Sequence, residues 1–316
     1  MRLALAGDTM LGRQVANAIE RSRRPPLAPD VVTVAAEADL FVLNLECCVS
    51  ARAERWPDPD KPFFFRAPPC AAELLAEIGV DCVTLANNHA LDYGPDALLD
   101  TLDHLQRVGV ATVGAGADAT AARRPRVLVA AGTSLAVLGV SDHPPDYAAG
   151  PGRCGIAYAD HAKAGWLAQA ITAARARADE VLVTPHWGPN MTASPPPHIR
   201  DAARALLAAG ATLVAGHSAH VFHGAAPRIL YDLGDFVDDY ATHPQLRNDL
   251  GLLFIVELGP GGPREAEAVP LRLDHCHTRL ATGDDAAYIR RRFIAACAEL
   301  GTVGVERDDR VVVTLG

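Results

Sequence analysis

The sequence predicts a layered α/β fold, in which helices cover sheets built mainly from parallel strands. Short apolar runs of strand length alternate along the chain with Ala- and Leu-rich stretches of helical length, which is typical of β–α units. Three of the short runs, FVLNL, VLVTPHW and TLVAGH, are almost continuously apolar. Strands that are buried on both faces have this character, because neither side of them meets water.

The individual elements follow from the same alternation. One helix has Pro95 at its start and Gly109 after its end, which are the usual residues at helix boundaries. The closing VVVTL run predicts an edge strand or a packed tail. In chain order we expect strand 3–6, helix 14–21, strand 40–43, helix 70–78, strand 82–85, helix 95–108, strands 111–113, 126–130 and 135–140, helix 162–178, strand 180–185, helix 199–209, strands 212–215, 228–231 and 252–257, and helix 286–299.

The composition is that of a globular protein and excludes two other classes. The chain has 316 residues, of which 49% are hydrophobic and 21% charged. Disordered proteins combine low hydrophobicity with high net charge, so that class is excluded. The 29 Lys and Arg residues against 38 Asp and Glu give a net charge of −9, and no long basic run occurs. This balance argues against nucleic-acid binding through phosphate contacts.

We expect a cytoplasmic protein without a membrane segment. No apolar run approaches the roughly 18 residues of a membrane span. The apolar run from Leu3 to Gly7 ends at Asp8 and is too short for a secretory signal, so a first strand is the better interpretation. The seven cysteines are odd in number and form no C-x-x-C pair, which favours reduced thiols over a set of disulfides.

Polar residues recur at one kind of position, immediately after a buried strand. In an open α/β sheet the carboxyl ends of the strands share one edge, and ligands bind in the crevice at that edge. We therefore expect residues from several separate strands to meet there. They are Asp8 after LALAG, Asn44 and Glu46 after FVL, Asn87, Asn88 and His89 after VTLA, Asp142 and His143 after AVLGVS, His186 after VLVTP, and His217 and His220 after TLVAG.

These residue types predict a metal site. Carboxylates, amide oxygens and imidazoles suit Mn²⁺, Zn²⁺ or Fe²⁺, and no thiolate is among them, which excludes a structural zinc finger. A carboxylate between two ions about 3.5–4 Å apart would form a two-metal clamp for hydrolysis. Each motif alone also has a structural interpretation, such as a turn, a helix cap or a core histidine. Their occurrence at so many strand ends favours the metal site.

The segment WPDPDKPFFFRAPP, residues 56–69, predicts a long, rigid and irregular loop. Such loops are uncommon in compact domains unless they have a function. The pair His275 and His277 alternates with period two near the C-terminal end. An exposed loop is the favoured interpretation of this pair, and the alternative is that it lines a substrate pocket.

The order of these motifs resembles the calcineurin-like metallophosphoesterase superfamily and, more closely, the CapA/PgsA-type proteins named for poly-γ-glutamate capsule synthesis. The resemblance rests on GDTMLGR, NLE, KPFFFRAPP, LANNHALDYG, VGAG, PHWGPN, AGHSAHVFHG and YDLGDFV, which lie between Leu3 and Val237. It implies a four-layer α/β/β/α sandwich of the metallophosphoesterase type, with the site between the strand ends of the two sheets. Residues 1–260 would form this domain, and residues 261–316 would be an extension packed on it.

The resemblance also implies how one or two divalent ions would be held. One ion would be bound by Asp8 and His220, and Glu46 would bridge both ions. The second ion would be bound by Asn88, His186 and His217.

The same resemblance implies roles beside the ions for three further residues. His89 would act next to the leaving group as a general acid or electrostatic stabiliser, and Asp92 would orient its ring. Arg66 in the aromatic loop would clamp an anionic group, since a guanidinium binds phosphate or carboxylate through two hydrogen bonds.

The chain departs from the superfamily pattern at its first motif. The superfamily has Asp-x-His there, whereas this chain has Met10, which cannot replace histidine as a hard ligand. The first metal site is therefore short of one donor. Relatives also commonly read SLGNF where this chain has DLGDF, and the extra carboxylates would assist metal binding or bind an amine. The candidates to complete the site are Asp142, His143 and Asp235.

Three functions follow. The first is a metal-dependent hydrolase acting on a phosphoester of a small anionic substrate through a metal-bound hydroxide. The second uses the same site to hydrolyse or transfer an amide, such as a γ-glutamyl linkage, with Arg66 and Asp235 bracketing an amino-acid zwitterion. The third is a non-catalytic binding or assembly component with a defective metal site, which Met10 motivates.

Overall fold

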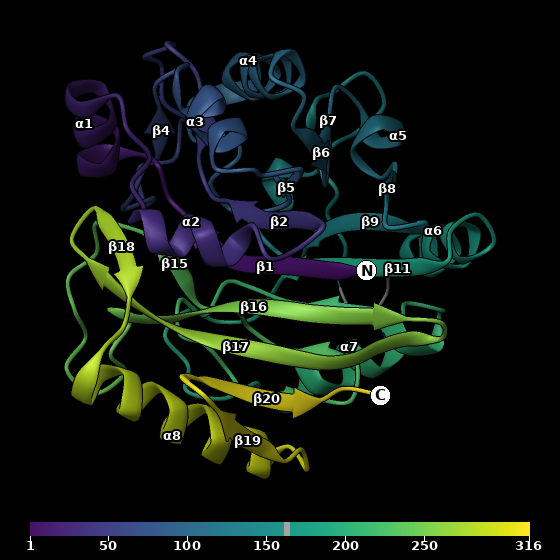
Figure 1. Cartoon of the computed structure of the whole chain (residues 1–316). Helices are drawn as coiled ribbons and strands as arrows, with labels where there is room; N and C mark the ends of the chain where they lie inside the picture. Colours follow the sequence, from purple (N-terminus) through teal and green to yellow (C-terminus); the bar gives the residue numbers. More distant parts are fainter. Residues whose placement is uncertain (161–164) are drawn as a thin grey trace.

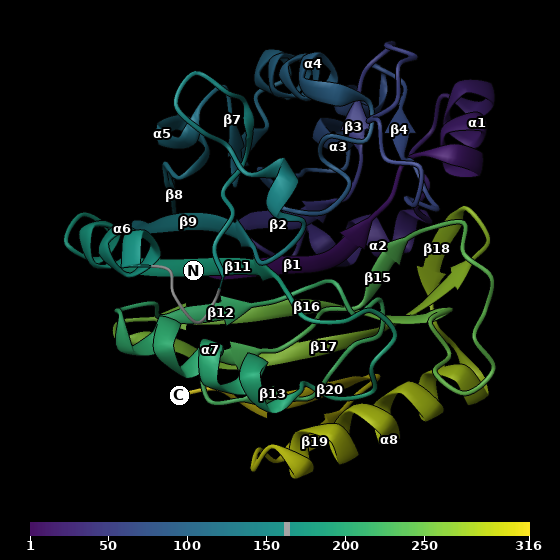
Figure 2. The ribbon, with the colours of Figure 1, turned by 180° about the vertical axis from the view of Figure 1, so that it is seen from behind.

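The computed structural model describes residues 1–160 and 165–316, and two β-sheets packed face to face lie at its centre (Figures 1 and 2). The first part of the larger sheet consists of parallel strands with helices on its outer face. A parallel neighbour requires a crossover connection, which these helices supply. The strands are β1 (Arg2–Thr9), β2 (Leu40–Leu45), β5 (Cys82–Thr84) and β6 (Ala111–Val113), and the helices are α1 (Arg13–Ser22), α2 (Pro29–Ala35), α3 (Ala71–Glu77) and α4 (Gly94–Arg107).

The C-terminal residues extend this sheet on the other side of β1. The short strand β15 (Asp235–Val237) pairs in parallel with the end of β1, and β16 (Leu250–Gly259) pairs antiparallel with its beginning. The sheet order is β19-β20-β17-β16-β1-β2-β5-β6. The remaining elements of this part are β17 (Gly262–Asp274), β18 (His277–Leu280), α8 (Gly283–Glu299), β19 (Gly304–Arg307) and β20 (Arg310–Thr314).

The smaller sheet also has a parallel centre, and two helices cover its outer face (Figure 2). Its order is β13 (Ala225–Ala226), β14 (Ile229–Leu230), β12 (Leu213–Ala215), β11 (Glu180–His186), β9 (Thr133–Ser141) and β8 (Arg126–Ala130), and its helices are α6 (Gly165–Arg175) and α7 (Pro197–Ala208). Minor elements are the pairs β3 (Cys48–Val49) with β4 (Arg66–Ala67) and β7 (Ala115–Gly116) with β10 (Gly155–Ile156), the helix α5 (Ala119–Ala122) and a 3₁₀ turn at Pro145–Tyr147.

Three separate apolar cores define four layers. Alternate residues of β1 enter different cores: Ala4 packs against the helices above the larger sheet, and Leu5 packs between the two sheets. In β11, Leu182 faces the other sheet and Val183 faces α6 and α7. This period-two alternation between two apolar environments explains the continuously apolar runs of the sequence. The predicted four-layer α/β/β/α sandwich is confirmed.

The structure differs from the predicted elements mainly in its C-terminal part. The segment 260–264, which is rich in Pro and Gly, forms the turn of a long hairpin at residues 260–261 and the first residues of β17. The strand β17 was not predicted, although its EAEAV stretch alternates charged and apolar residues as a half-buried strand does. Of the predicted helix 162–178, residues 162–164 lie outside the described residues, and the described part is Gly165–Arg175.

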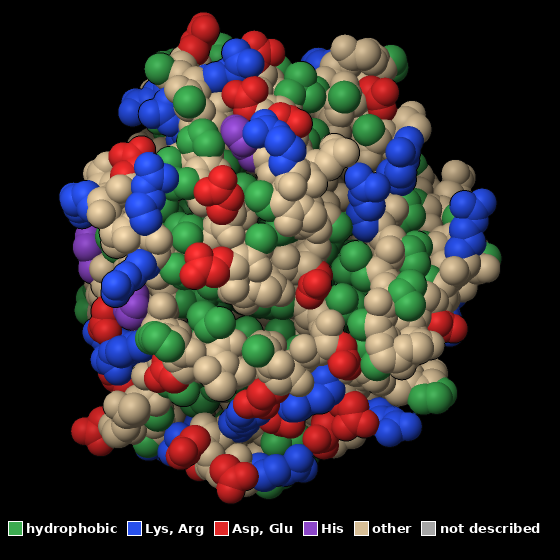
Figure 3. Space-filling model, turned by 45° about the horizontal axis from the view of Figure 1, so that its top comes forward, with side chains coloured by type: hydrophobic (Ala, Val, Ile, Leu, Met, Phe, Trp, Pro, Cys, Tyr) green, Lys and Arg blue, Asp and Glu red, His purple; other side chains and the backbone are tan. Residues whose placement is uncertain are grey.

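All seven cysteines are free thiols in the structure. Across residues 1–160 and 165–316, no helix combines the length and the apolar character that a membrane crossing would require. On the face shown in Figure 3, Lys and Arg side chains are interspersed with Asp and Glu side chains.

Gly7 allows the closest backbone approach beside the strand ends. The amide nitrogen of Asp8 donates to the carbonyl oxygen of Gly234 at 2.9 Å, and the register of β1 shifts at this point. A Cβ placed at Gly7 would lie 1.8 Å from that carbonyl oxygen.

We therefore expect Gly7→Ala to lower the free energy of unfolding by more than the about 1–3 kcal/mol that overpacking commonly costs, because the obstructing atom is backbone. Denaturant titration measures this. The control is Gly79→Ala, where φ is +83° and nothing lies within 4 Å of an added Cβ. The left-handed backbone alone should cost about 1–2 kcal/mol there. Equal losses in the two variants would contradict the prediction.

Candidate metal centre

Four predicted ligands come from the carboxyl ends of four parallel strands and meet between the sheets. Asp8 lies near the end of β1, Glu46 directly follows β2, His186 is the last residue of β11, and His217 comes shortly after β12. None of these four side chains is more than 1% exposed. An isolated parallel bridge between His186 and His217 continues the pairing of β11 with β12 and brings the two rings together.

The donor atoms fall into two groups that share one carboxylate. Atoms of Asp8, His186 and His217 that could each bind a metal all lie within 4.8 Å of one another, and so do those of Asp8, Glu46 and His220. The resemblance implied that Glu46 bridges the two ions. In the structure Asp8 is the residue common to both groups.

The polar atoms without partners fit bound divalent ions. Both carboxylate oxygens of Glu46, the Oδ1 atom of Asn88 and the Nε2 atom of His217 are buried, and none has a hydrogen-bond partner within the described part of the chain. Such an atom costs roughly 1–3 kcal/mol when it is left unpaired, and most buried polar atoms are paired. Carboxylate, amide oxygen and imidazole are the donors that Mn²⁺, Zn²⁺ and Fe²⁺ accept, so the residues present suit such an ion.

Asp8 is held from several sides. Its Oδ1 accepts a hydrogen bond from Nδ2 of Asn44 at 2.7 Å, and its Oδ2 accepts one from the backbone nitrogen of Ser218 at 3.2 Å. Burial acts to raise the pKa of Asp8, but the hydrogen bond from His220 and the charges of His220 and His217 outweigh it, so the pKa is lowered. Asp8 is therefore an ionised carboxylate with a fixed orientation.

His220 lies between two carboxylates. Its Nδ1 is 3.2 Å from Oδ2 of Asp8 and 2.8 Å from Oδ1 of Asp235. Burial acts to lower the pKa of His220, but Asp235 and Asp8 raise it well above the ordinary value. His220 also has a left-handed φ of 58°, and Ser218 has a φ of 117°. Such strain in non-glycine residues persists where the surrounding structure enforces it and is common at functional sites.

Burial is the largest cause of the pKa shifts of Glu46 and the two strand-end histidines. Oε1 of Glu46 lies 3.8 Å from Nε2 of His89 and 4.0 Å from Nε2 of His186. Burial and the charge of Asp8 raise the pKa of Glu46 well above its usual range. Burial lowers the pKa of His217 to about 4 and that of His186 well below the ordinary value. Both of these rings are therefore neutral near pH 7 and present lone pairs to a cation.

His89 and Asp92 form a buried pair beside this cluster. Nδ1 of His89 lies 2.6 Å from Oδ2 of Asp92, so a proton on Nδ1 satisfies both atoms and leaves Nε2 facing Glu46. Burial lowers the pKa of His89, although Asp92 acts to raise it. The ring of Phe65 stands edge-on to the imidazole at 4.5 Å between centroids. The structure therefore brings together two of the three residues for which the resemblance implied roles beside the ions.

The third, Arg66, lies away from the pocket. Its guanidinium donates to the backbone oxygen of Arg52 and covers the ring of Tyr93 at 4.7 Å. The cation of the same loop that reaches the site is Lys61, which the sequence reasoning missed. Nζ of Lys61 lies 3.1 Å from Oδ1 of Asp92 and donates to the backbone oxygen of Asn88 at 2.7 Å. The signal was in the quoted KPFFFRAPP motif, whose first residue is Lys61.

The residues considered as replacements for the missing first-motif histidine have different surroundings. Met10 is fully buried in the apolar core between the helices and the larger sheet. Asp235 contacts His220, as described above, and its Oδ2 has no hydrogen-bond partner among the residues that the structure describes. Asp142 accepts from the backbone nitrogen of Gly188 at 3.0 Å and pairs with His143. Of the three candidates, Asp235 therefore contacts the group of Asp8, Glu46 and His220, whereas the ring of His143 lies 5.1 Å from that of His186 in the other group.

A pocket of about 460 Å³ opens beside the cluster and is where a substrate would lie. Apolar walls come from Phe63, Met191 and Tyr240. Its polar lining comes from Lys61, Asn88, His89, Asn190, His220 and Asn248. His275 and His277 line a different groove, next to α1, which contains none of the predicted ligands.

Comparisons with known proteins agree with the motifs. The family model described as bacterial capsule synthesis protein PGA_cap matches residues 2–240. A probable polyglutamine synthesis accessory protein of Mycobacterium tuberculosis is 30% identical over 294 residues, which cover 87% of this chain and 76% of that protein. The PGA biosynthesis protein CapA of Bacillus subtilis is 29% identical over 244 residues, which cover 75% of this chain and 63% of that protein.

A solved structure shows the same fold. The crystal structure of a hypothetical protein from Thermus thermophilus superposes with a TM-score of 0.51 and 17% identity, and the match covers 87% of this chain and 100% of that chain. The family match runs from the start of β1 to residue 240, shortly after β15, and so it includes every ligand of the two donor groups. The predicted resemblance is thereby confirmed, and the chain belongs to the bacterial capsule synthesis protein family PGA_cap.

Proposed function

We propose that this chain is a metal-dependent hydrolase that cleaves a phosphoester of a small anionic substrate. The observation that carries the proposal is the pair of buried donor groups sharing Asp8, in which both oxygens of Glu46 lack partners among the described residues. The adjoining pocket gives a substrate access to this cluster. One or two ions of Mn²⁺, Zn²⁺ or Fe²⁺ are proposed, and a cytoplasmic location remains a prediction from the sequence.

The residues around the ions have distinct tasks. Bound divalent ions would polarise a water nucleophile and neutralise charge on the attacked group. Asp8, His186 and His217 would hold one ion, and Asp8, Glu46 and His220 the other. The buried Oδ1 of Asn88, which has no partner within the described residues, is available as a further ligand. Asp235 orients His220 through its Nδ1 atom, as the outer partners of metal-binding histidines do.

His89 is proposed to deliver a proton to the leaving oxygen. Nδ1 of His89 is engaged by Asp92, so the reacting nitrogen is Nε2, on the side of Glu46 and the pocket. Nε2 would first take up a second proton from solvent and then pass that proton to the leaving oxygen. Burial lowers the pKa of His89. The protonated ring is therefore a stronger acid than an ordinary imidazolium. Asn190 lines the same pocket and is proposed as a hydrogen-bonding group for the substrate.

The names of the relatives, a synthesis accessory protein and a biosynthesis protein, favour a non-catalytic accessory role as a second candidate. Cleavage or transfer of a glutamyl amide linkage is the third candidate. The sequence argument for the amide reaction placed Arg66 and Asp235 on either side of a zwitterion. In the structure Arg66 bonds to Arg52 and Asp235 bonds to His220, so neither lines the pocket. The phosphoester is therefore the substrate that we propose, and γ-glutamyl peptides belong in the same assay panel.

We expect the purified protein to bind Mn²⁺ or Zn²⁺ and to hydrolyse generic phosphomonoesters or phosphodiesters. Asp8→Ala should abolish both properties, because it removes the carboxylate common to both donor groups, and His186→Ala should reduce metal content by about one ion. Elemental analysis and a hydrolase substrate panel measure this. The control is His275→Ala, an exposed histidine in another groove. A wild-type protein that binds no metal and remains inactive in excess Mn²⁺ would overturn the proposal.

The two donor groups should differ in the pH dependence of metal binding. Glu46 and His220 have raised pKa values and must release protons to bind, so binding at their group should strengthen as the pH rises above the ordinary pKa of histidine. His217 has a pKa of about 4, so binding at its group should change little until the pH approaches that value. Calorimetric titrations in two buffers of different ionisation enthalpy count the released protons. Equal proton release for both ions would contradict this assignment.

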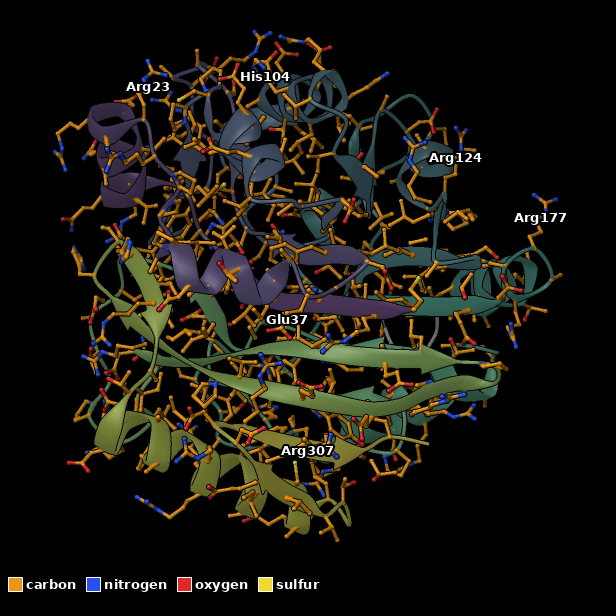
Figure 4. All side chains as sticks on the ribbon, viewed as in Figure 1. Arg23, Glu37, His104, Arg124, Arg177 and Arg307 are labelled. Carbon is orange, nitrogen blue, oxygen red and sulfur yellow. The ribbon has the colours of Figure 1, made fainter. Side chains whose placement is uncertain are left out.

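We expect His89→Gln to lower kcat by a factor of about 10²–10⁴ for esters with poor leaving groups and much less for nitrophenyl esters, which need no proton. Metal content should stay at the wild-type value, because His89 belongs to neither donor group. His104→Gln is the control, since His104 lies on α4 at the periphery of the molecule (Figure 4). A uniform loss across all leaving groups would assign His89 a different role.

A further inference from the structure

Lys61 has an unusual position for a basic residue of this chain. The sequence has two lysines among its 29 basic residues, and the others are arginines. Many of the arginines are exposed, and Arg23, Arg124 and Arg177 project outward in Figure 4. The Lys61 side chain is only 12% exposed. It lines the pocket at the metal centre, next to His89.

The ammonium group of Lys61 is bound to groups on the segment that carries His89. It donates to the backbone oxygen of Asn88 at 2.7 Å and lies 3.1 Å from Oδ1 of Asp92, whose side chain is fully buried. Within residues 1–160 and 165–316, Lys61 is the one Lys or Arg side chain at ion-pair distance from Asp92. A buried carboxylate without such a partner is strongly unfavourable.

The two oxygens of Asp92 are restrained by different groups. Oδ2 accepts from the backbone nitrogen of Phe65 and contacts Nδ1 of His89, each at 2.6 Å. Oδ1 contacts Lys61 and accepts a long hydrogen bond of 3.4 Å from the hydroxyl of Tyr147. A carboxylate fixed at both oxygens cannot rotate about its Cβ–Cγ bond. By binding Oδ1, Lys61 therefore keeps Oδ2 of Asp92 directed at the imidazole of His89.

The rigid loop around Lys61 is built onto the same aspartate. The backbone nitrogen of Trp56 donates to the backbone oxygen of Asp92 at 2.9 Å, and the Trp56 ring stands edge-on to Tyr147 at 4.9 Å between centroids. Lys61 lies between Trp56 and Phe65, both of which bond to Asp92. The loop thus delivers one ammonium group to one buried carboxylate.

We propose that Lys61 is a positioning residue, which holds Asp92 so that His89 keeps its proton on Nδ1 and presents Nε2 to the leaving group. The kinetic part of this inference rests on the proposed hydrolase function. The arrangement of Lys61, Asp92 and His89 does not depend on that function, so it can be tested by a measurement that needs no activity.

The first test uses the metal-free protein. In long-range ¹H–¹⁵N spectra of protein labelled in histidine, wild-type His89 should show the Nδ1–H tautomer. Lys61→Met should give a mixture of tautomers or a shifted ring signal, and Lys61→Arg, which keeps the charge, should restore the wild-type pattern. Arg55→Met is the matched control, because Arg55 is an exposed cation directly before this loop and stacks on Phe64 within it. If Lys61→Met does not fold, Lys61→Gln replaces it.

The second test is kinetic and uses the metal-loaded protein. Loss of an outer hydrogen-bond partner commonly costs about 10–100-fold in activity, so Lys61→Met should lower kcat by that factor for poor leaving groups. KM should change by less than about threefold, because the ground-state contacts remain. Lys61→Arg should recover most of kcat, and Arg55→Met should behave as wild type.

Two results would overturn the inference. The first is an unchanged His89 signal in both the Met and the Gln variant. The second is a raised KM with unchanged kcat, which would make Lys61 a direct substrate ligand. If wild-type protein hydrolyses nothing, the proposed function fails, and the tautomer spectra alone decide the role of Lys61.

Discussion

The structure depends on how carboxylates buried between the two sheets are compensated. Asp8, Glu46, Asp92, Asp232 and Asp235 are each at most 1% exposed. An ionised carboxylate in such a place needs a cation or several donors, or else it takes up a proton. Asp8 and Asp92 have cationic and N–H partners. Burial raises the pKa of Glu46, Asp232 and Asp235 well above the usual range. Of these three, Glu46 belongs to a donor group, so a divalent ion bound there would favour its charged form.

The backbone near these carboxylates holds them in place through close contacts and amide hydrogen bonds. Gly7 lets the carbonyl of Gly234 approach β1 and accept the Asp8 amide. The strained turn after β12 directs the Ser218 amide at Asp8, and the Ala219 amide at Asp232. Backbone amides therefore help the side-chain partners to stabilise the buried carboxylates. Such rigid support is what a metal centre requires, since ligands must be oriented before the ion arrives.

The parallel strands and most ligands could be predicted from the sequence because their signals are local. A continuous apolar run followed by Asp, Glu, Asn or His is visible in the residues alone, and the family motifs added the four layers. The choice between Lys61 and Arg66 could not be made this way. Neighbouring residues in extended backbone point to opposite sides, and Phe65 faces His89 while Arg66 faces Tyr93. The carboxylate that belongs to both donor groups also depends on a shift in the register of β1 after Ala6, and no sequence motif indicates that shift.

The strand β1, which carries Asp8, is completed by β16, which is far from it in the sequence. The amino group of Met1 donates to the carbonyl oxygen of Leu258, 257 positions away, and β16 lies beyond residue 240, where the family match ends. Contacts this distant in sequence form slowly, because a long loop must close first. During synthesis β1 therefore waits with one unpaired edge until residues up to 259 have left the ribosome. An apolar strand edge that stays unpaired is prone to associate with other chains, so the order of synthesis carries a kinetic risk that the final stability of the fold does not reveal.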